Sequence, residues 1–384
     1  MNTDDRPMSP ILILTDLPPV SPPSETDDFD SFSIESELLE QRLKAINYAE
    51  IIINRDSLFN DTINQFKSLG LTRIYVKFDG EPGDDFEGLT RELISEFWKE
   101  FCEKLSGGEK LLYLNPTAMS YPKEEDLVVV GKILMIGFIL TGFLPTQFNN
   151  SFLFFVLTGK RLKGSLESFL SCFSNETNEL FRNCLAGTNG FGIDAKLAIS
   201  RVLSYFELSS LPTTPSELQT VLESLATFIL YVKPHHMLEF IRKGALSITS
   251  KFEQCSDKDF LSYIEKQKPK GSDIVKILNP SYSENPNYRF AEETVVTFLE
   301  DFLEDLNHED ASTFMKYVSG CEMMRGSVRV EFNSETNVEL MVPKAGTCGV
   351  SISISRFFLN QNQFSGIMSN LLANPSLWAR FDSV

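Results

Sequence analysis

One cysteine of the sequence stands in surroundings that suit covalent chemistry. Cys348 lies in the loop PKAGTCG (343–349), between two stretches in which apolar and polar residues alternate. Its small neighbours leave the sulfur reachable. No Asp or Glu occurs from residue 340 to residue 381, although 53 acidic residues in 384 predict about six in such a stretch. The sequence around this thiol therefore contributes no negatively charged side chain.

The remaining charges of this stretch favour a reactive thiol. Lys344, Arg356 and Arg380 are its only charged residues. A cysteine reacts as the thiolate, which nearby cations stabilise. Because no suitable general base is close to Cys348 in the sequence, we expect it to attack an acyl group that is already activated, such as a thioester. A cysteine hydrolase stays open as an alternative, and it requires the fold to bring a His and an acid around Cys348.

The other five cysteines lie in apolar segments, where a thiol packs as a small hydrophobic group. They are Cys102, Cys172, Cys184, Cys255 and Cys321. No two cysteines are closer than 12 residues, and the chain has three histidines. A structural zinc site needs close paired ligands, so we expect no metal site, and we expect no cofactor. His235 and His236 begin an apolar helical pattern and are predicted to be surface or capping residues.

Composition and charge exclude several classes of function. The chain is 42% hydrophobic and 23% charged, as in folded globular proteins. Its net charge of −18 does not fit the positive patch that nucleic-acid binding requires. The segment GGEK (107–110) lacks the earlier glycine of a phosphate-binding loop, and no GxSxG sequence marks a serine hydrolase. We therefore expect neither nucleic acid nor nucleotide as a ligand.

An uncharged stretch, residues 133–159, could be mistaken for a membrane span. Pro145, Gln147 and Asn149 divide it into two pieces that are too short for the ~20 apolar residues of a span. We expect two buried elements joined by a turn, and no membrane contact. Asp4 and Asp5 stand where a secretory signal would carry basic residues. This favours an intracellular protein, cytoplasmic and/or nuclear, with free thiols.

Residues 1–40 differ in composition from the rest of the chain. They hold six of the 18 prolines, ten acidic residues and a single basic one. Such a segment buries too little apolar surface to offset the entropy of ordering, so we expect a disordered acidic tail. Within it, the run Ile11-Leu12-Ile13-Leu14 and the acidic residues after it resemble a SUMO-interacting motif, which adds a strand to a sheet edge. A chance apolar patch is the alternative.

The remaining residues predict an α+β fold with two lobes. The alternating strand 72–78 and the amphipathic helix that begins near Thr90 are followed by helices over 160–280. Short alternating strands at 328–332, 338–342 and 350–355 then lie between two helical patterns, at 295–302 and 364–372. We expect a large, mainly helical lobe over 46–285, a small α/β lobe over 290–384, and a hinge in the polar stretch between Pro280 and Pro286.

Four segments, from about residue 72 to the C-terminus, resemble the HECT-type ubiquitin ligases. They are VKFDGEPGDDFEGLTREL (76–93), VVVGKILMIGFILTGFLPTQF (128–148), TFMKYVSGC (313–321) and VPKAGTCGVSISISRFFLNQNQF (342–364). The first resembles the family's opening strand and its G-L-T-R-E helix start. The last resembles its proline–Thr–Cys active-site loop. Phe381, fourth from the end, matches the aromatic residue that these ligases keep near the C-terminus.

The resemblance implies a bilobal HECT-like fold and a ubiquitin-protein ligase without a cofactor. Cys348 would accept ubiquitin as a thioester from a ubiquitin-conjugating enzyme bound to the large lobe, and would pass it to a lysine of a protein substrate. Thr347 belongs to the matched loop, Phe381 would dock the tail, and Asp382 would help to deprotonate the incoming lysine. The small lobe would swing about the linker near 280–290 to serve both steps.

The chain departs from the family pattern in three places. Gly349 replaces the bulky Phe that usually follows the catalytic cysteine, and the paired glycines before the L-T-R-E stretch are reduced to Glu87-Gly88. The middle region, where the conjugating enzyme should bind, is shorter than in typical members. These departures keep a second class of function open, a catalytically degenerate HECT-like binding scaffold, which predicts an unreactive or buried Cys348.

Overall fold

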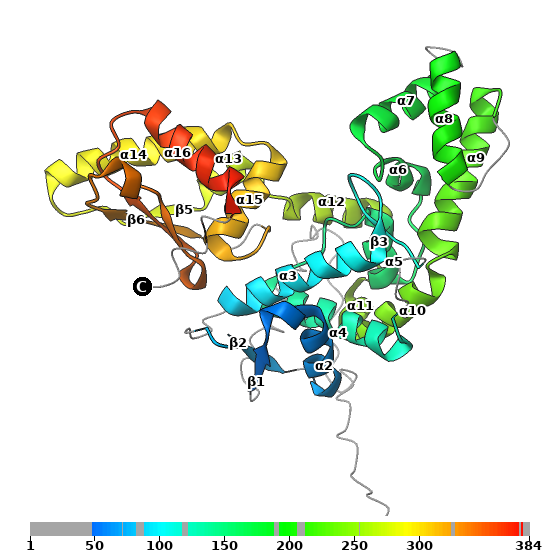
Figure 1. Ribbon diagram of the computed structural model, residues 1–384, viewed down its shortest axis with the longest axis horizontal. Helices are drawn as coiled ribbons and strands as arrows, with labels where there is room; N and C mark the ends of the chain where they lie inside the picture. Colours follow the sequence, from blue (N-terminus) through cyan, green and yellow to red (C-terminus); the bar gives the residue numbers. More distant parts are fainter. Residues whose placement is uncertain are drawn as a thin grey trace, which may run out of the picture.

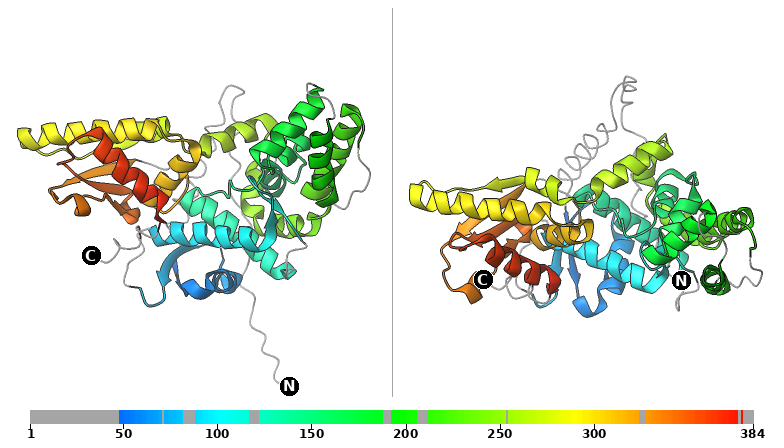
Figure 2. Two further views of the ribbon diagram at one scale, coloured as in Figure 1. Left: turned by 45° about the horizontal axis from the view of Figure 1, so that its top comes forward. Right: turned by 90° about the horizontal axis from the view of Figure 1, so that it is seen from above.

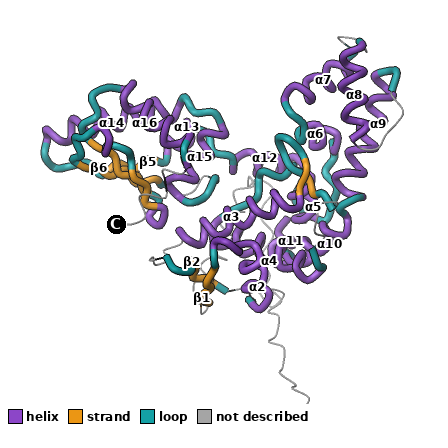
Figure 3. Tube along the Cα trace, viewed as in Figure 1, coloured by secondary structure: helices purple, strands orange, loops and turns teal. Residues whose placement is uncertain are grey.

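The computed structural model describes residues 48–70, 72–81, 88–116, 122–187, 192–205, 212–252, 254–323, 327–375 and 378. Over these ranges the chain is an α+β protein, as expected, with many helices and three small sheets (Figures 1 and 3). The acidic tail with its run Ile11-Leu12-Ile13-Leu14 lies outside the described residues. Phe381 and Asp382 also lie outside them.

The buried apolar side chains gather in two separate clusters. The first core takes its residues from 51–264 and adds Cys321 and Met323. The second core takes its residues from 274–372. In Figures 1 and 2, helices α7, α8 and α9 lie at the end of the molecule farthest from the second core. The contact between the two cores is therefore made by other elements of the first.

Strands β1 (Tyr48–Ile53) and β2 (Arg73–Phe78) form a parallel pair at one side of the first core. The predicted strand 72–78 is confirmed, because Ile74, Val76 and Phe78 are buried on one face. Strand β1, which buries Ile51 and Ile53, was not predicted from the sequence. A second, very short antiparallel pair consists of β3 (Ser106–Gly107) and β4 (Tyr113–Leu114).

Helices make up the rest of the first core. In chain order they are η2 (Arg55–Ser57), α2 (Leu58–Ser68), α3 (Gly88–Leu105), α4 (Glu124–Thr141), α5 (Asn150–Thr158), α6 (Ser165–Leu170), α7 (Asn175–Ala186), α8 (Ile193–Tyr205), α9 (Pro215–Thr227), the π-helical turn η3 (Phe228–Val232), α10 (His235–Gly244), α11 (Leu246–Phe252) and α12 (Asp257–Gln267). The uncharged stretch 133–159 forms α4, a turn and α5, as predicted. In the described part of the chain, no helix has the length and apolar character needed to cross a membrane.

Helices α4 and α10 cross at unusually short distance. A Cβ atom added at Gly131 of α4 would lie 1.9 Å from the carbonyl oxygen of Ile241. One added at Gly244 of α10 would lie 1.9 Å from the carbonyl oxygen of Val128. Only a residue without a Cβ fits at either position, so the two backbones pack directly on each other.

The second core is built on a four-stranded sheet of order β5-β6-β8-β7. Strands β5 (Leu278–Pro280), β6 (Val328–Asn333) and β8 (Ser351–Ser355) are parallel, and β7 (Lys344–Gly346) is antiparallel at the edge. The helices are α13 (Gly271–Lys276), α14 (Pro286–Glu304), α15 (His308–Ser319) and α16 (Gln361–Ala373), with the 3-10 turns η4 (Val338–Leu340) and η5 (Thr347–Gly349). The strands predicted at 328–332 and 350–355 and both predicted helices are confirmed.

The hinge predicted between Pro280 and Pro286 is wrong. Pro280 ends strand β5 of the second sheet, and Pro286 begins α14, so both belong to the second core. Along the chain the first core ends at Ile264 and the second begins at Ile274. The connecting segment is therefore 265–273, from the last turn of α12 through residues 268–270 to the first turn of α13 (Figure 1). Strand β5 has only three residues and lies next to a polar stretch between two prolines, so no alternating pattern identifies it in the sequence.

The strand predicted at 338–342 is also wrong. Residues 338–340 form η4, in which Val338 and Leu340 are exposed. The side chain of Asn337 accepts a hydrogen bond from the Glu339 N–H and starts the turn. The position beside β8 is occupied by β7 instead, and the turn leaves residues 338–340 outside the sheet.

Candidate active site

Cys348 lies in the turn η5, which connects β7 to β8 at the edge of the second sheet. The residue after the turn, Val350, has φ +48° and ψ +63° and is the one non-glycine residue with positive φ in the described ranges. A β-branched residue in this region is strained and persists only where its surroundings hold it. The carbonyl of Val350 accepts from the Arg329 N–H of β6. The side chain of Cys348 itself is not among those described.

Arg91, in the first turn of α3, connects the first core to this turn. Its side chain is almost fully buried. Its Nε donates to the carbonyl oxygen of Ser319 at 2.6 Å, and its Nη2 donates to the carbonyl oxygen of Thr347. Ser319 ends α15, and Thr347 directly precedes Cys348. One guanidinium therefore binds two backbone segments of the second core.

Lys316 of α15 makes a second link between the cores. Its Nζ lies 3.3 Å from Glu96 Oε1 on α3 and 3.3 Å from Glu322 Oε1. Burial disfavours the charged ammonium, but Glu322 and Glu96 outweigh it and raise the pKa of Lys316. Just beyond α15, Met323 packs in the first core, where its Sδ accepts from the Leu144 N–H at 3.0 Å.

The three cations predicted around Cys348 have different positions. Lys344 is exposed on β7, and Arg380 lies outside the described residues. Arg356 follows the far end of β8, about 20 Å of extended chain from Val350, and its Nη1 lies 3.2 Å from Glu292 Oε1. The expectation that Arg356 acts on the thiol is therefore wrong, because its charge is paired with a buried carboxylate at the opposite end of the strand.

The cation that does reach the turn, Arg91, was not among those predicted from the sequence. Arg91 stands three residues before Ile94 and seven before Trp98, which places it on the apolar face of α3. A charged residue on a face that is otherwise apolar indicates a buried partner. The fold was needed to show that this partner is the backbone of Ser319 and Thr347, more than 200 residues away in the sequence.

Two aromatic side chains support the base of the Cys348 loop. The hydroxyl of Tyr317 on α15 donates to the carbonyl oxygen of Pro343. The Tyr317 ring lies 5.3 Å from the ring of Trp378, whose Nε1 donates to the Leu371 carbonyl oxygen at 2.9 Å. The chain near its C-terminus thus returns to the helices beside the loop.

The other cysteines are buried, as predicted. All five contribute to the first core: Cys102, Cys172, Cys184, Cys255 and Cys321. Burial raises the pKa of Cys102 and of Cys172 to about 12 and that of Cys255 to about 11. These thiols are protonated at neutral pH and are poor nucleophiles.

The histidines lie away from the candidate site. His235 and His236 are exposed at the start of α10, as predicted, and His236 Nε2 lies 3.1 Å from Glu124 Oε1. His308 Nδ1 lies 2.9 Å from the Pro269 carbonyl oxygen at the start of α15, about 16 Å along that helix from Ser319. A cysteine hydrolase would need a histidine beside the Cys348 turn, and none of the three histidines lies there, so this alternative is not supported. Among the described residues, no three His, Cys, Asp or Glu side chains gather as a metal ion would require.

The arrangement can present a single nucleophile to an activated acyl group. The turn that carries Cys348 is fixed by β6 on one side and by Arg91 on the other, and the nearest buried charge is positive. The turn therefore has a buried cation bound to its backbone and no histidine beside it to act as general base. No protein-family model matches this chain, and no curated protein matches it either.

Proposed function

We propose that this protein is a HECT-type ubiquitin-protein ligase with Cys348 as the ubiquitin acceptor. The observation that carries the proposal is the position of the Cys348 turn, on the smaller core and facing α3 of the larger one. A thiol on a small body that is joined to a larger helical body suits a reaction in which it meets two partners in turn. The short, divergent motifs resemble those of the G2/M-phase-specific ubiquitin ligase and its vertebrate relatives.

In the first step, the Cys348 thiolate attacks the carbonyl carbon of the thioester between ubiquitin and the conjugating enzyme. A new carbon–sulfur bond forms, the old one breaks, and the enzyme's cysteine leaves as a thiolate. In the second step, a substrate lysine amine attacks the Cys348 thioester, an amide forms, and the amine loses its proton. Asp382 would assist that proton loss, Phe381 would dock the tail, and Thr347 would hold the loop. No cofactor takes part in either step.

The first core would correspond to the HECT N-lobe and the second core to the C-lobe. The helices farthest from the second core expose apolar side chains on α8, where Ile193 and Leu197 are 86% and 52% exposed. An exposed apolar surface of this kind suits docking of the conjugating enzyme. Binding of SUMO through the run Ile11-Leu12-Ile13-Leu14 and an intracellular location remain predictions.

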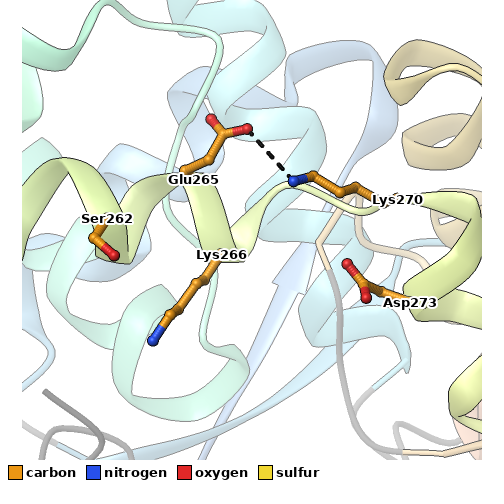
Figure 4. A pocket seen from close by; sticks show the side chains of 5 residues that line it. All are labelled: Ser262, Glu265, Lys266, Lys270 and Asp273. Carbon is orange, nitrogen blue, oxygen red and sulfur yellow. Dashed lines mark ion pairs between the residues drawn. The ribbon is translucent and has the colours of Figure 1, made fainter. Parts of the chain in front are cut away.

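The swing between the two steps would occur in the connecting segment. A pocket of about 280 Å³ lies along it and is lined by Ser262, Glu265, Lys266, Lys270 and Asp273 (Figure 4). Lys270 Nζ is 3.9 Å from Glu265 Oε1, a loose ion pair between exposed side chains. At Gly271 the chain is held again, because a Cβ there would lie 1.7 Å from the Leu303 carbonyl oxygen of α14. Pro269 is buried and its carbonyl oxygen already lies 2.9 Å from His308 Nδ1 of the second core, so the hinge would lie at the end of α12, around 267–268.

The test is a single-turnover transfer from conjugating enzymes preloaded with labelled ubiquitin, resolved on a non-reducing gel. We expect a reductant-sensitive adduct with the wild-type chain and none with Cys348→Ala. Cys255→Ala is the matched control, because it removes a buried thiol and should leave the adduct unchanged. Absence of the adduct across a broad panel of conjugating enzymes would contradict the proposal.

A binding scaffold is the second candidate, and Gly349 is the observation in its favour. Among the described residues beyond its chain neighbours, a Cβ added at Gly349 would meet the Ser351 Oγ at 3.9 Å, which is ordinary van der Waals contact. The turn therefore lacks the bulky side chain that the family pattern places after the catalytic cysteine, although a Cβ would fit there. The scaffold predicts that Gly349→Phe gains no transfer activity, whereas a weakened ligase should gain some.

A further inference from the structure

Arg91 is a charged side chain buried between the two cores. A buried guanidinium is costly unless its donors are satisfied, and its planar fork can bind acceptors on two different elements at once. Here the two acceptors are the carbonyl oxygens of Ser319 and Thr347, both in the second core, whereas α3 packs in the first. The contact therefore exists only in this arrangement of the two cores.

The Thr347 carbonyl is half of the peptide unit that leads into Cys348. Because that unit is planar, fixing the carbonyl fixes the direction of the Cys348 backbone. The same oxygen also accepts from the Val350 N–H at 3.4 Å, so Arg91 binds the atom that closes the strained turn. A strained φ of this kind is kept by contacts outside the turn.

The charge of Arg91 acts at the same place. Its Nη2 is one peptide unit from Cys348, and among the cations expected there Arg356 is neutralised by Glu292. A cation in a poorly solvated position acts more strongly on a neighbouring titratable group than an exposed one such as Lys344.

We propose that Arg91 is a positioning residue for Cys348, which orients the turn through the Thr347 carbonyl and favours the thiolate when the two cores are in contact. This inference rests on the proposed function for its meaning, because it makes the reactivity of the ubiquitin acceptor depend on the arrangement of the cores. Its test needs no ubiquitin.

The experiment measures alkylation of Cys348 by iodoacetamide in the full chain from pH 5.5 to 9.5, with peptide mass spectrometry as the readout. For Arg91→Met we expect the midpoint of the pH profile to rise by about one unit, which is about tenfold slower alkylation below the midpoint. For Arg91→Lys we expect a smaller rise, because lysine keeps the charge but cannot bind both carbonyls.

Lys316→Met is the matched control, since Lys316 also joins the cores but contacts Glu96 and Glu322. We expect its midpoint to stay within about 0.3 unit of the wild type. An unchanged midpoint in Arg91→Met, or an equal rise in Lys316→Met, would overturn the inference. Thermal melts report whether each variant folds. If Arg91→Met does not fold, the test uses Arg91→Lys. A midpoint of its alkylation profile equal to that of the wild type would then overturn the positioning role of Arg91.

The two proposals fail separately. If the Arg91 variants shift the alkylation profile but the wild type forms no ubiquitin adduct, the positioning role stands and the ligase function falls. If the adduct forms and the profiles coincide, the function stands and the positioning role falls.

Discussion

The first core and the second core are held together in different ways. In the first, aromatic rings pack on each other: the centroids of Trp98, Phe101 and Phe148 lie 5.1 to 6.3 Å apart. The second core packs aromatic rings as well, with the centroids of Phe358 and Phe364 5.0 Å apart, and adds a fully buried carboxylate. Glu292 accepts from the N–H and the Oγ–H of Ser283 and pairs with Arg356. Apolar packing stabilises the first core, but it does not join specific pairs of groups in a fixed geometry. The buried ion pair instead fixes where β8 ends relative to α14.

The largest expected contrast between the cores lies in thiol reactivity. At pH 8, a thiol with a pKa of about 12, such as Cys102 or Cys172, is thiolate in about one molecule in ten thousand. Since the raised pKa keeps these groups protonated below pH 12, their alkylation should be at least a thousandfold slower than that of Cys348, by about the ratio of thiolate fractions.

Iodoacetamide labelling of the native chain at pH 8, followed by peptide mass spectrometry, measures this contrast. The control is the same labelling in concentrated urea, where all six cysteines should react at similar rates. Labelling of Cys102 at the rate of Cys348 in the native chain would remove the distinction between the two cores.

The second prediction breaks the ion pair of the second core. Glu292→Gln leaves the guanidinium of Arg356 without its carboxylate, and we expect the free energy of unfolding to fall by about 3 kcal/mol. Urea denaturation measures it. Arg356→Met added to Glu292→Gln should recover part of the loss, because the unpaired charge is then gone.

Glu293→Gln is the matched control on the same helix. Its carboxylate pairs with Arg289 at 2.9 Å, and both side chains are about half exposed. An exposed pair contributes less than about 0.5 kcal/mol. Equal losses for Glu292→Gln and Glu293→Gln would contradict the role given to the buried pair.

The smallest expected effects come from a Gly→Ala substitution made once in each core, which should change the free energy of unfolding in opposite directions. Gly131→Ala forces α4 and α10 apart and should cost about 1–3 kcal/mol. Gly366→Ala should instead stabilise by about 0.5–1 kcal/mol, because Gly366 lies inside α16 with open space around its Cβ position. Urea unfolding of each single variant gives the sign, and a gain for Gly131→Ala would contradict the close crossing.

Local patterns predicted the elements with one buried face. The alternation in β2 and the helical spacing in α3 are set by which side of an element meets apolar neighbours. Strand β1 was missed because Tyr48–Ile53 has no clean alternation, and it is a strand because β2 offers it a parallel partner. The stretch 338–342 does alternate, but Asn337 starts a 3-10 turn there and β7 takes the place beside β8.

For the candidate site, too, some features could be predicted from the sequence and others required the tertiary structure. The sequence by itself determined the α+β class, the burial of the five structural cysteines and the acid-poor loop around Cys348, because these depend on residue type and near neighbours. Only the tertiary structure decided the connecting segment at 265–273, the pairing of Arg356 with Glu292 and the contact of Arg91 with Thr347. These features depend on which surfaces pack against each other in the folded chain. The partner of a buried charge is set by that packing and can lie at any distance along the sequence.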